Sequence, residues 1–312
     1  MPYLESLQRD GFVKVPGLFS GDELAALRAA AENAASFARA GKWPHFRTVP
    51  KQFPPWPTTP PPASEGGIWG VQHLLHPEFP DRQEFARVYF SDKILAVAED
   101  LLDVKRDEAG GNDSSDEMLV MELFNMLIAP ETKNFELRWH RDDIPETATA
   151  DEELKMLHAK SPNGKQSHAQ YNLALCPDTS LAVIPGSHRR ARTEIERNAD
   201  PYEPVLPDQL VVELKPGDAV FYDSNILHRG VYQCKPEGGE ETRLTVHGSI
   251  GLKGTGIEGD EKVRATAVLQ HGVGAWVHRD DAAFGLGDRP EKMRANLVAM
   301  GTGEGVGYSL QG

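Results

Sequence analysis

The sequence predicts a mainly β fold with flanking helices, because the amino-acid composition changes along its 312 residues. The first third is rich in Ala and Leu, which are strong helix formers. From residue 118, short runs of β-branched and aromatic residues alternate with Pro, Gly and Asp, and a last helical run covers 288–300. Six or more short strands separated by turn signals predict an antiparallel sandwich or jelly roll.

The helical part begins after a short strand predicted at 12–17. Ser20 and Glu23 form the S-x-x-E pattern of a capping box, so the Ala-rich run behind them is expected to be a helix. Gly41 is placed to end this helix, as a glycine beyond the last turn often does.

Two further helices are predicted at about 81–90 and 91–103, the second with Ser91 at its N-cap. Before them, the prolines of 44–67 exclude a regular helix. Aromatic residues such as Trp56 indicate that this segment is an ordered loop, which either packs on the β core or acts as a lid.

The β part is expected to follow a polar loop at 106–117. Two insertions interrupt it, because 151–160 is predicted to be helical and the charged stretch 235–241 is predicted to be a hairpin tip. The strands are predicted at 118–129, 169–176, 181–186, 209–214, 218–224 and 243–250.

Length and composition bound the organisation and the partners. We expect one domain over 1–312, with a helical part to about 105, a jelly-roll core at about 116–255 and a C-terminal helix and tail at about 256–312. The net charge of −14 argues against nucleic acid and anionic membranes as partners, and no stretch approaches the roughly 20 apolar residues that span a bilayer. Two isolated cysteines and an N-terminus without an apolar run predict a cytoplasmic protein that acts on a small molecule, with its oligomeric state left open.

Three residues form a candidate metal site. His140 and Asp142 lie one residue apart in RWHRDD, and His228 follows far downstream in NILHRG. Alternate side chains of a strand point to one face, so His140 and Asp142 are expected to project together, with Arg141 on the opposite side and Asp143 solvated. Two imidazoles and one carboxylate occupy one face of a metal and leave positions open, as a non-haem Fe(II) oxygenase requires.

Arg243 is the candidate partner of an organic acid beside that metal. It lies in ETRLTVHGS, on the strand predicted after the 235–241 hairpin. Such oxygenases use 2-oxoglutarate, whose far carboxylate needs a fixed cation, and a guanidinium binds carboxylates through a planar fork and stays charged. Arg229 is a poorer candidate because it flanks His228.

Four segments carry a resemblance to a known family. They are 7–32, where a DGF strand precedes a capped helix, the RWHRDD segment, VIPGSHRRAR at 183–192, and PGDAVFYDSNILHRG at 216–230. Together they resemble the phytanoyl-CoA dioxygenase (PhyH-like) family of Fe(II)/2-oxoglutarate-dependent oxygenases, over roughly residues 5–250. The resemblance implies a double-stranded β-helix (jelly roll, cupin-like) core with flanking helices.

The same resemblance implies roles for individual residues. Fe(II) is expected on His140, Asp142 and His228, and the 2-oxoglutarate carboxylate on Arg243. Some family members contact the cosubstrate with an Asn on the strand before the HxD pair, a role that Asn125 can fill. Asn172 and Gln170 share one face of a predicted strand, which lines the same cavity or faces solvent, and His188 of the PGSH segment is expected to be structural or at the cavity edge.

The expected activity is oxidation of a C–H bond, most simply hydroxylation, of a small organic metabolite with 2-oxoglutarate and O₂, giving succinate and CO₂. Related halogenases have a small residue in place of the carboxylate, so Asp142 favours oxygen chemistry. Two alternatives remain, a cupin-type metal-dependent hydrolase or isomerase with Zn or Mn, and a non-catalytic relative that binds 2-oxoglutarate or another ligand. The family permits acyl-CoA, amino acid, terpenoid and alkaloid substrates, and no basic cleft in the sequence favours CoA.

Overall fold

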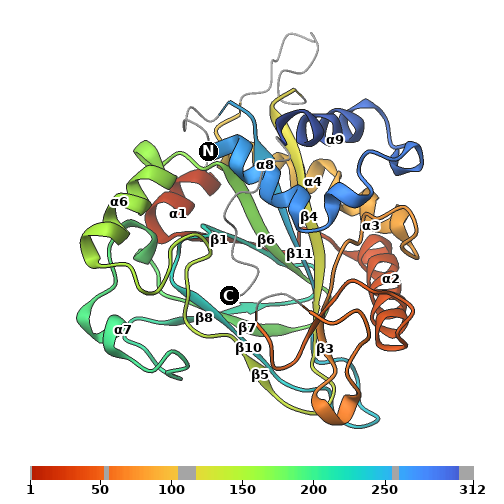
Figure 1. Cartoon of the computed structure of the whole chain (residues 1–312), viewed down its shortest axis with the longest axis horizontal. Helices are drawn as coiled ribbons and strands as arrows, with labels where there is room; N and C mark the ends of the chain where they lie inside the picture. The colour runs from red at the N-terminus through yellow and green to blue at the C-terminus, as the bar shows by residue number, and fades with distance from the viewer. Residues whose placement is uncertain (1, 53–55, 105–116, 255–259, 302–312) are drawn as a thin grey trace.

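The computed structural model describes residues 2–52, 56–104, 117–254 and 260–301 (Figure 1). Within these residues the strands form two antiparallel sheets. The larger has seven strands in the order β1-β9-β6-β11-β4-β3-β2, and the smaller has four in the order β5-β10-β7-β8. Side chains from both sheets line one cavity, which places the functional residues between the layers.

From β4 onward the strands alternate between the two sheets, except that β7 and β8 follow one another in the smaller sheet. From β4 onward the chain visits the larger sheet with β4, β6, β9 and β11 and the smaller sheet with β5, β7, β8 and β10. This alternation confirms the predicted jelly-roll core. The strands are β1 Phe12–Val15, β2 Phe46–Thr48, β3 Ile68–Val71, β4 Leu119–Ile128, β5 Phe135–Glu136, β6 His168–Ala174, β7 Asp178–Val183, β8 Leu210–Leu214, β9 Ala219–Tyr222, β10 His228–Tyr232 and β11 Leu244–Leu252.

Helices cover the outer face of the larger sheet and one end of the molecule. Figure 1 shows α2, α3 and α9 along one side of β4 and β11, and α6 and α7 on the other side of the molecule. The helices are α1 Pro2–Asp10, α2 Gly21–Arg39, α3 Arg82–Tyr89, α4 Asp92–Leu101, α6 Ala150–Lys160, α7 Glu194–Asn198, α8 Asp260–Gln270 and α9 Asp288–Met300. Short 3-10 helices lie at Ala63–Glu65, Pro162–Gly164, Ser187–Arg189, Val273–Ala275 and Asp280–Ala282.

The largest hydrophobic core lies between these helices and the larger sheet. Leu27 of α2, Leu95 of α4 and Met293 of α9 pack in the same cluster as the outward-facing residues of the strands, such as Phe124 and Tyr171. The inward-facing residues of the same strands are left for the cavity, because successive side chains of a strand point to opposite faces.

Several local predictions are confirmed. The helices expected at 81–90, 91–103, 151–160 and 288–300 are α3, α4, α6 and α9. Ser91 caps α4, because its side chain accepts a hydrogen bond from the amide of Ile94 at 3.4 Å.

The capping box predicted at the start of α2 is wrong. Ser20 is the N-cap, but its side chain makes no capping hydrogen bond. Glu23 pairs with Lys93 of α4 instead, so a tertiary ion pair replaces the local one. At the other end, Gly41 follows the last turn with φ of 71°, a left-handed conformation that glycine adopts without strain.

The hairpin predicted around 235–241 is also wrong. β10 belongs to the smaller sheet and β11 to the larger one, so the segment between them is a crossover between layers. The helices α1 and α8 were not expected, since both are short and stabilised by packing, as the burial of Leu7 and Val268 indicates.

The Pro-rich segment 44–67 contributes an edge strand. Its residues 46–48 form β2, which pairs with β3 at one edge of the larger sheet. Residues 53–55 and nearly all of the loop predicted at 106–117 lie outside the described residues. Among the described residues, the helices are too short or too polar to cross a bilayer. The division of the chain into parts of a single domain stays a prediction.

Candidate active site

The two histidines meet through one pair of backbone hydrogen bonds. The amides of His140 and His228 donate to each other's carbonyls, both at 3.0 Å. His228 begins β10, whereas His140 lies in an isolated bridge, so the prediction of a regular strand through His140 and Asp142 is wrong. After the bridge the chain leaves the sheet, because the amide of Asp142 donates to the carbonyl of Ser224 at 2.9 Å.

Both imidazoles turn the same nitrogen towards a common centre. Nδ1 of His140 lies 2.7 Å from the carbonyl oxygen of Arg138, and Nδ1 of His228 lies 2.9 Å from that of Ile226. A carbonyl only accepts, so each Nδ1 carries the proton and each Nε2 presents a lone pair. Burial, with a smaller contribution from His228, lowers the pKa of His140 to about 3, so this ring is neutral, the form that binds metal.

Asp142 completes the set of donor atoms. Its Oδ1 lies 3.5 Å from Nε2 of His140 and 3.6 Å from Nε2 of His228, and one donor atom from each residue lies within 4.8 Å of the others. Its second oxygen accepts a hydrogen bond from Nε2 of Gln170 at 3.0 Å. Two Nε2 lone pairs and a carboxylate oriented by a neighbouring amide fit a divalent metal held on one face.

Arg141 points away from this centre, as predicted. Its Nε donates to Oε1 of Glu153 at 2.7 Å. Its other nitrogens donate to the carbonyls of Ser187 and Arg190, each at 3.0 Å, and to that of Asn225. The guanidinium thereby ties the segment of His140 and Asp142 to the loop that leads into His228.

Arg243 lies just before β11 in the same interior. It is 3% exposed, and its Nε donates to Oδ2 of Asp178 at 3.2 Å. Its guanidinium carbon lies 4.1 Å from the ring centroid of Tyr232, while its Nη1 has no hydrogen-bond partner among the described residues. A cavity of about 100 Å³ is lined by this arginine together with His140, Asp142 and His228.

Asp178 keeps Arg243 in place as an ion pair. Burial alone raises the pKa of Asp178, but Arg243 and hydrogen bonds from Thr245 and Ser180 outweigh it and lower the pKa. The carboxylate is therefore charged beside the guanidinium. Because Asp178 engages Nε, the Nη1 side of the fork is left for another acceptor.

Comparison with known proteins identifies the class of enzyme to which this geometry belongs. The profile of the family described as Phytanoyl-CoA dioxygenase (PhyH) matches residues 7–231. The chain belongs to the PhyH family. It is therefore an Fe(II)- and 2-oxoglutarate-dependent oxygenase, an oxidoreductase that uses O₂. No curated protein sequence matches this PhyH chain.

Solved structures of similar fold agree with the family. AviO1 from Streptomyces viridochromogenes Tue57 is 16% identical with a TM-score of 0.52, over 80% of this chain and 93% of that one. EctD from S. alaskensis, solved with 2-oxoglutarate and 5-hydroxyectoine, is 19% identical with a TM-score of 0.52, over 80% and 74%. HygX from Streptomyces hygroscopicus, with nickel and 2-oxoglutarate bound, is 15% identical with a TM-score of 0.51, over 80% and 86%. At these low sequence identities, the similarity to the solved structures shows a shared fold.

The remaining polar residues of the small cavity in this PhyH protein come from neighbouring strands. Asn172 of β6 lines the cavity. Its Oδ1 lies 2.9 Å from Nδ1 of His247 on β11. Asn125 of β4 is buried but lines neither this cavity nor the larger one beside it. Its Oδ1 accepts a hydrogen bond from the amide of His73 at 3.0 Å, and its Nδ2 has no partner among the described residues.

His247 and Arg47 are cavity residues that sequence reasoning missed. His247 lies four residues after Arg243 on the same face, so the alternation of β11 was a signal for it. Burial first, and Arg47 next, lower its pKa to about 3. Arg47 belongs to β2 inside the Pro-rich segment, where the sequence offers no signal of its position because β2 joins the sheet only at its edge.

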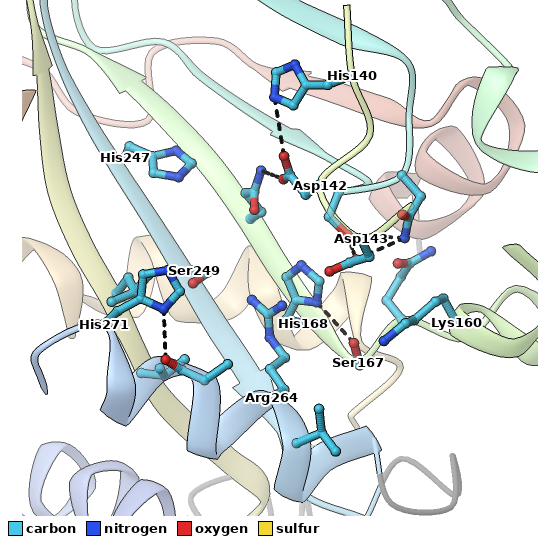
Figure 2. A pocket seen from close by; sticks show the side chains of 18 of the residues that line it. His140, Asp142, Asp143, Lys160, Ser167, His168, His247, Ser249, Arg264 and His271 are labelled. Atoms are coloured by element: carbon cyan, nitrogen blue, oxygen red, sulfur yellow. Dashed lines mark hydrogen bonds and ion pairs between the residues drawn. The ribbon is translucent and has the colours of Figure 1, made fainter. Parts of the chain in front are cut away.

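A larger cavity of about 340 Å³ opens beside His140 and Asp142 (Figure 2). Trp56 and Gln52 of the Pro-rich segment line it, so this segment forms part of its wall. Asp143 also lines it and accepts hydrogen bonds from Oγ of Ser224 at 2.9 Å and Nδ2 of Asn225 at 3.2 Å. Asp143 is exposed, as expected, but the prediction that it lies on the opposite face is wrong, because the chain has left the strand at this point.

Two further residues singled out in the sequence are structural. Arg229 pairs with Glu136 at 2.8 Å and donates to the carbonyls of Tyr202 and Glu203, which excludes it as a partner of the small cavity. His188 lines neither the small nor the larger cavity, and its Nε2 lies 3.2 Å from the carbonyl oxygen of Gln8.

Proposed function

We propose that His140, Asp142 and His228 hold Fe(II), and that Arg243 binds the far carboxylate of 2-oxoglutarate. The enzyme then hydroxylates a C–H bond of a small organic metabolite, with succinate and CO₂ as co-products. The observation that carries this proposal is the convergence of two Nε2 lone pairs and one carboxylate oxygen beside a buried guanidinium.

When bound, the metal and 2-oxoglutarate supply the oxidising chemistry, in which the cosubstrate is decarboxylated as O₂ is consumed. The chain's own residues orient the reactants and exclude water. Gln170 fixes one oxygen of Asp142, and Asp178 with Tyr232 holds Arg243 beneath the cavity. Nη1 of Arg243 has no hydrogen-bond partner among the described residues. A bound carboxylate would accept a hydrogen bond from it, whereas without one a buried charged donor stays unsatisfied.

Two asparagines are proposed to contact the cosubstrate. Asn172 is supported by its place in the wall of the small cavity beside His247. Asn125 lines neither cavity in this structure, so its proposed contact rests on the family resemblance alone and would use Nδ2, because its oxygen is engaged by His73.

A small-molecule substrate is supported by the size of the larger cavity, about 340 Å³. Solved structures of similar fold support the same conclusion, because one of EctD was solved with 5-hydroxyectoine and a second one of HygX with hygromycin B. A cytoplasmic location is supported by Cys176 and Cys234, which are both free thiols.

Succinate formation tests the proposal. Protein loaded anaerobically with Fe(II) is mixed with 2-oxoglutarate and O₂, and we expect succinate release that His140→Ala, Asp142→Ala and His228→Ala each abolish. The exposed His158 of α6 provides the matched control, since it lines neither the small nor the larger cavity. Absence of succinate from the iron-loaded protein, with hydrolysis or isomerisation by a Zn- or Mn-loaded form, would support the cupin-type alternative instead.

A further inference from the structure

Tyr222 touches two of the residues that are proposed to hold the metal, one directly and one through an amide. It lies on β9, opposite Gln170 of β6 in the antiparallel register, and Nε2 of Gln170 donates to Oδ2 of Asp142 at 3.0 Å. The ring of Tyr222 also packs edge-on against that of His228, with centroids 5.4 Å apart and an interplanar angle of 63°. This tyrosine therefore lies between the two sides of the candidate metal site.

Tyr222 forms part of the wall of the small cavity. The residue is 6% exposed and lines the cavity of about 100 Å³ that Arg243 also lines, but not the larger cavity. Its ring packs in an apolar cluster with Val183 and Ile226. A tyrosine has an apolar body and a polar tip, so with the ring enclosed in this way the hydroxyl is the part suited to a ligand in the cavity.

Gln170 leaves the proton of this hydroxyl for another acceptor. A carboxylate only accepts, so Nε2 of Gln170 faces Asp142, and this nitrogen carries a second proton. A side-chain hydrogen bond joins Gln170 to Tyr222 and lowers the pKa of the phenol, as expected where the amide is the donor. Burial first, and Asp142 next, outweigh that effect and raise the pKa, so the phenol keeps its own proton.

We propose that Tyr222 donates a hydrogen bond to 2-oxoglutarate, at the 2-oxo acid end. The inference rests on the proposed function and adds a binding residue to its cosubstrate site. The small cavity is lined by the three residues proposed to hold the metal and by Arg243. A molecule whose far carboxylate bonds to Arg243 therefore directs its 2-oxo acid end towards those three residues. Tyr222 belongs to that end, because it contacts His228 and, through Gln170, Asp142.

The hydroxyl and the guanidinium thus contact opposite ends of one small molecule. Arg243 supplies charge for the far carboxylate, whereas Tyr222 supplies a neutral donor for an oxygen of the 2-oxo acid group. A neutral donor suits this end, because the metal already supplies positive charge there when it is bound. The position of Tyr222 opposite Gln170 also fixes the donor relative to Asp142, since both are held by the same amide.

Calorimetric titration of Tyr222→Phe with 2-oxoglutarate tests the hydrogen bond in protein loaded anaerobically with Fe(II). The variant removes the hydroxyl and keeps the ring against His228. We expect the Kd of 2-oxoglutarate to rise at least about tenfold, because hydrogen bonds to charged groups are the stronger class. The affinity for Fe(II), measured by competitive titration, and the midpoint of urea unfolding should stay close to those of the wild type.

Pyruvate identifies the end of the cosubstrate that Tyr222 contacts. It contains the 2-oxo acid group and lacks the far carboxylate, and its Kd is measured by competition with 2-oxoglutarate. Tyr222→Phe should weaken pyruvate and 2-oxoglutarate by similar factors. Arg243→Met should weaken 2-oxoglutarate and leave the affinity for pyruvate close to that of the wild type.

Tyr171 of β6 offers the matched control. Its hydroxyl is buried with no hydrogen-bond partner among the described residues, and the residue lines neither the small nor the larger cavity. Tyr171→Phe removes the same atom from another buried tyrosine of the larger sheet. Its affinities for 2-oxoglutarate and pyruvate should therefore equal those of the wild type.

Four results would overturn the inference. They are an unchanged affinity for 2-oxoglutarate in Tyr222→Phe, an equal loss in Tyr171→Phe, a loss for 2-oxoglutarate with pyruvate unaffected, and a loss of Fe(II) affinity in place of the loss for 2-oxoglutarate. The last result would show that the hydroxyl positions the metal site instead. Failure of the wild-type protein to bind 2-oxoglutarate contradicts the proposed function, whereas normal binding in both wild type and Tyr222→Phe contradicts only the role of Tyr222.

Discussion

Arg243 shows how a single side chain becomes specific through its neighbours. Its charge is buried against one carboxylate, that of Asp178, and over one ring, that of Tyr232. A lone buried cation would be costly, so these two contacts are what allow the guanidinium to remain in the interior. They also restrict its orientation, so that Nη1 is the nitrogen left for a ligand.

Replacement of Arg243 by Met is expected to raise the Kd of 2-oxoglutarate at least about tenfold, because hydrogen bonds to charged groups contribute about 1.5–3 kcal/mol. Iron content should stay close to that of the wild type, since the arginine is not among the three residues proposed to hold the metal. Calorimetric titration and metal analysis of the same samples measure the two quantities.

Arg243→Lys is the matched control for charge. It keeps the cation but loses the planar fork, so its Kd for 2-oxoglutarate should lie between those of the wild type and of Arg243→Met. Unchanged affinity in Arg243→Met would remove this residue from the cosubstrate site.

At the scale of elements, the segment that carries His140 and Asp142 is held by a buried cluster rather than by a strand. Glu153 of α6 accepts from Arg141 at 2.7 Å and from Arg197 at 2.8 Å, and Arg192 lies 3.4 Å away. Arg141 also binds three backbone carbonyls of the surrounding loops. The insertion that contains α6 therefore positions His140 and Asp142 from outside the jelly roll.

Arg141→Met is expected to destabilise the protein by about 3–5 kcal/mol. Removing the arginine leaves the buried carboxylate of Glu153 without one of its cations and three backbone carbonyls without a donor. It should also weaken Fe(II) binding, since both loops that carry the metal-binding residues lose their common contact. Urea unfolding and competitive metal titration measure these effects.

Arg138→Met provides a nearby comparison. Its side chain pairs with Glu146 at 2.8 Å near the surface, where such pairs contribute only about 0–1 kcal/mol. A loss of stability in Arg138→Met equal to that in Arg141→Met would contradict the role given to the cluster.

For the whole molecule, buried histidines link stability to pH. His73 is 5% exposed, and burial, with smaller contributions from His45 and His76, lowers its pKa from 6.5 to about 3. Below pH 6.5 the unfolded chain binds a proton that the folded protein excludes. Stability from this residue is therefore complete above pH 6.5 and is lost as pH falls towards 3.

His73→Asn should reduce the pH dependence of the free energy of unfolding. Between pH 7 and pH 5, the free energy of unfolding should fall by about 2 kcal/mol more in the wild type than in the variant. This follows because His73 contributes about 1.4 kcal/mol per unit of pH below 6.5. Asn is chosen because position 73 has φ of 62°, a conformation that Asn tolerates. Urea unfolding at the two pH values measures the difference, and an equal slope in wild type and variant would contradict it.

The sequence by itself determined the class of fold and predicted the three residues whose donor atoms the structure brings together. Short β runs with turn signals predict a jelly roll whatever their pairing, and His140, Asp142 and His228 are recognisable because few residue types bind iron in this pattern. Arg243 was singled out for a similar reason, because a guanidinium is specific for carboxylates, and the structure places it in the same cavity.

Only the tertiary structure decided how these residues are held and what surrounds them. The bend after His140 results from hydrogen bonds to the 224–228 loop, and the crossover at 235–241 depends on which sheet each strand joins. His168 and Arg47 reach the larger cavity because β6 and β2 lie in one sheet, although they are far apart in the chain. Local sequence encodes alternation and turn propensity, whereas the pairing of distant strands arises from burial of their side chains, which no short segment specifies alone.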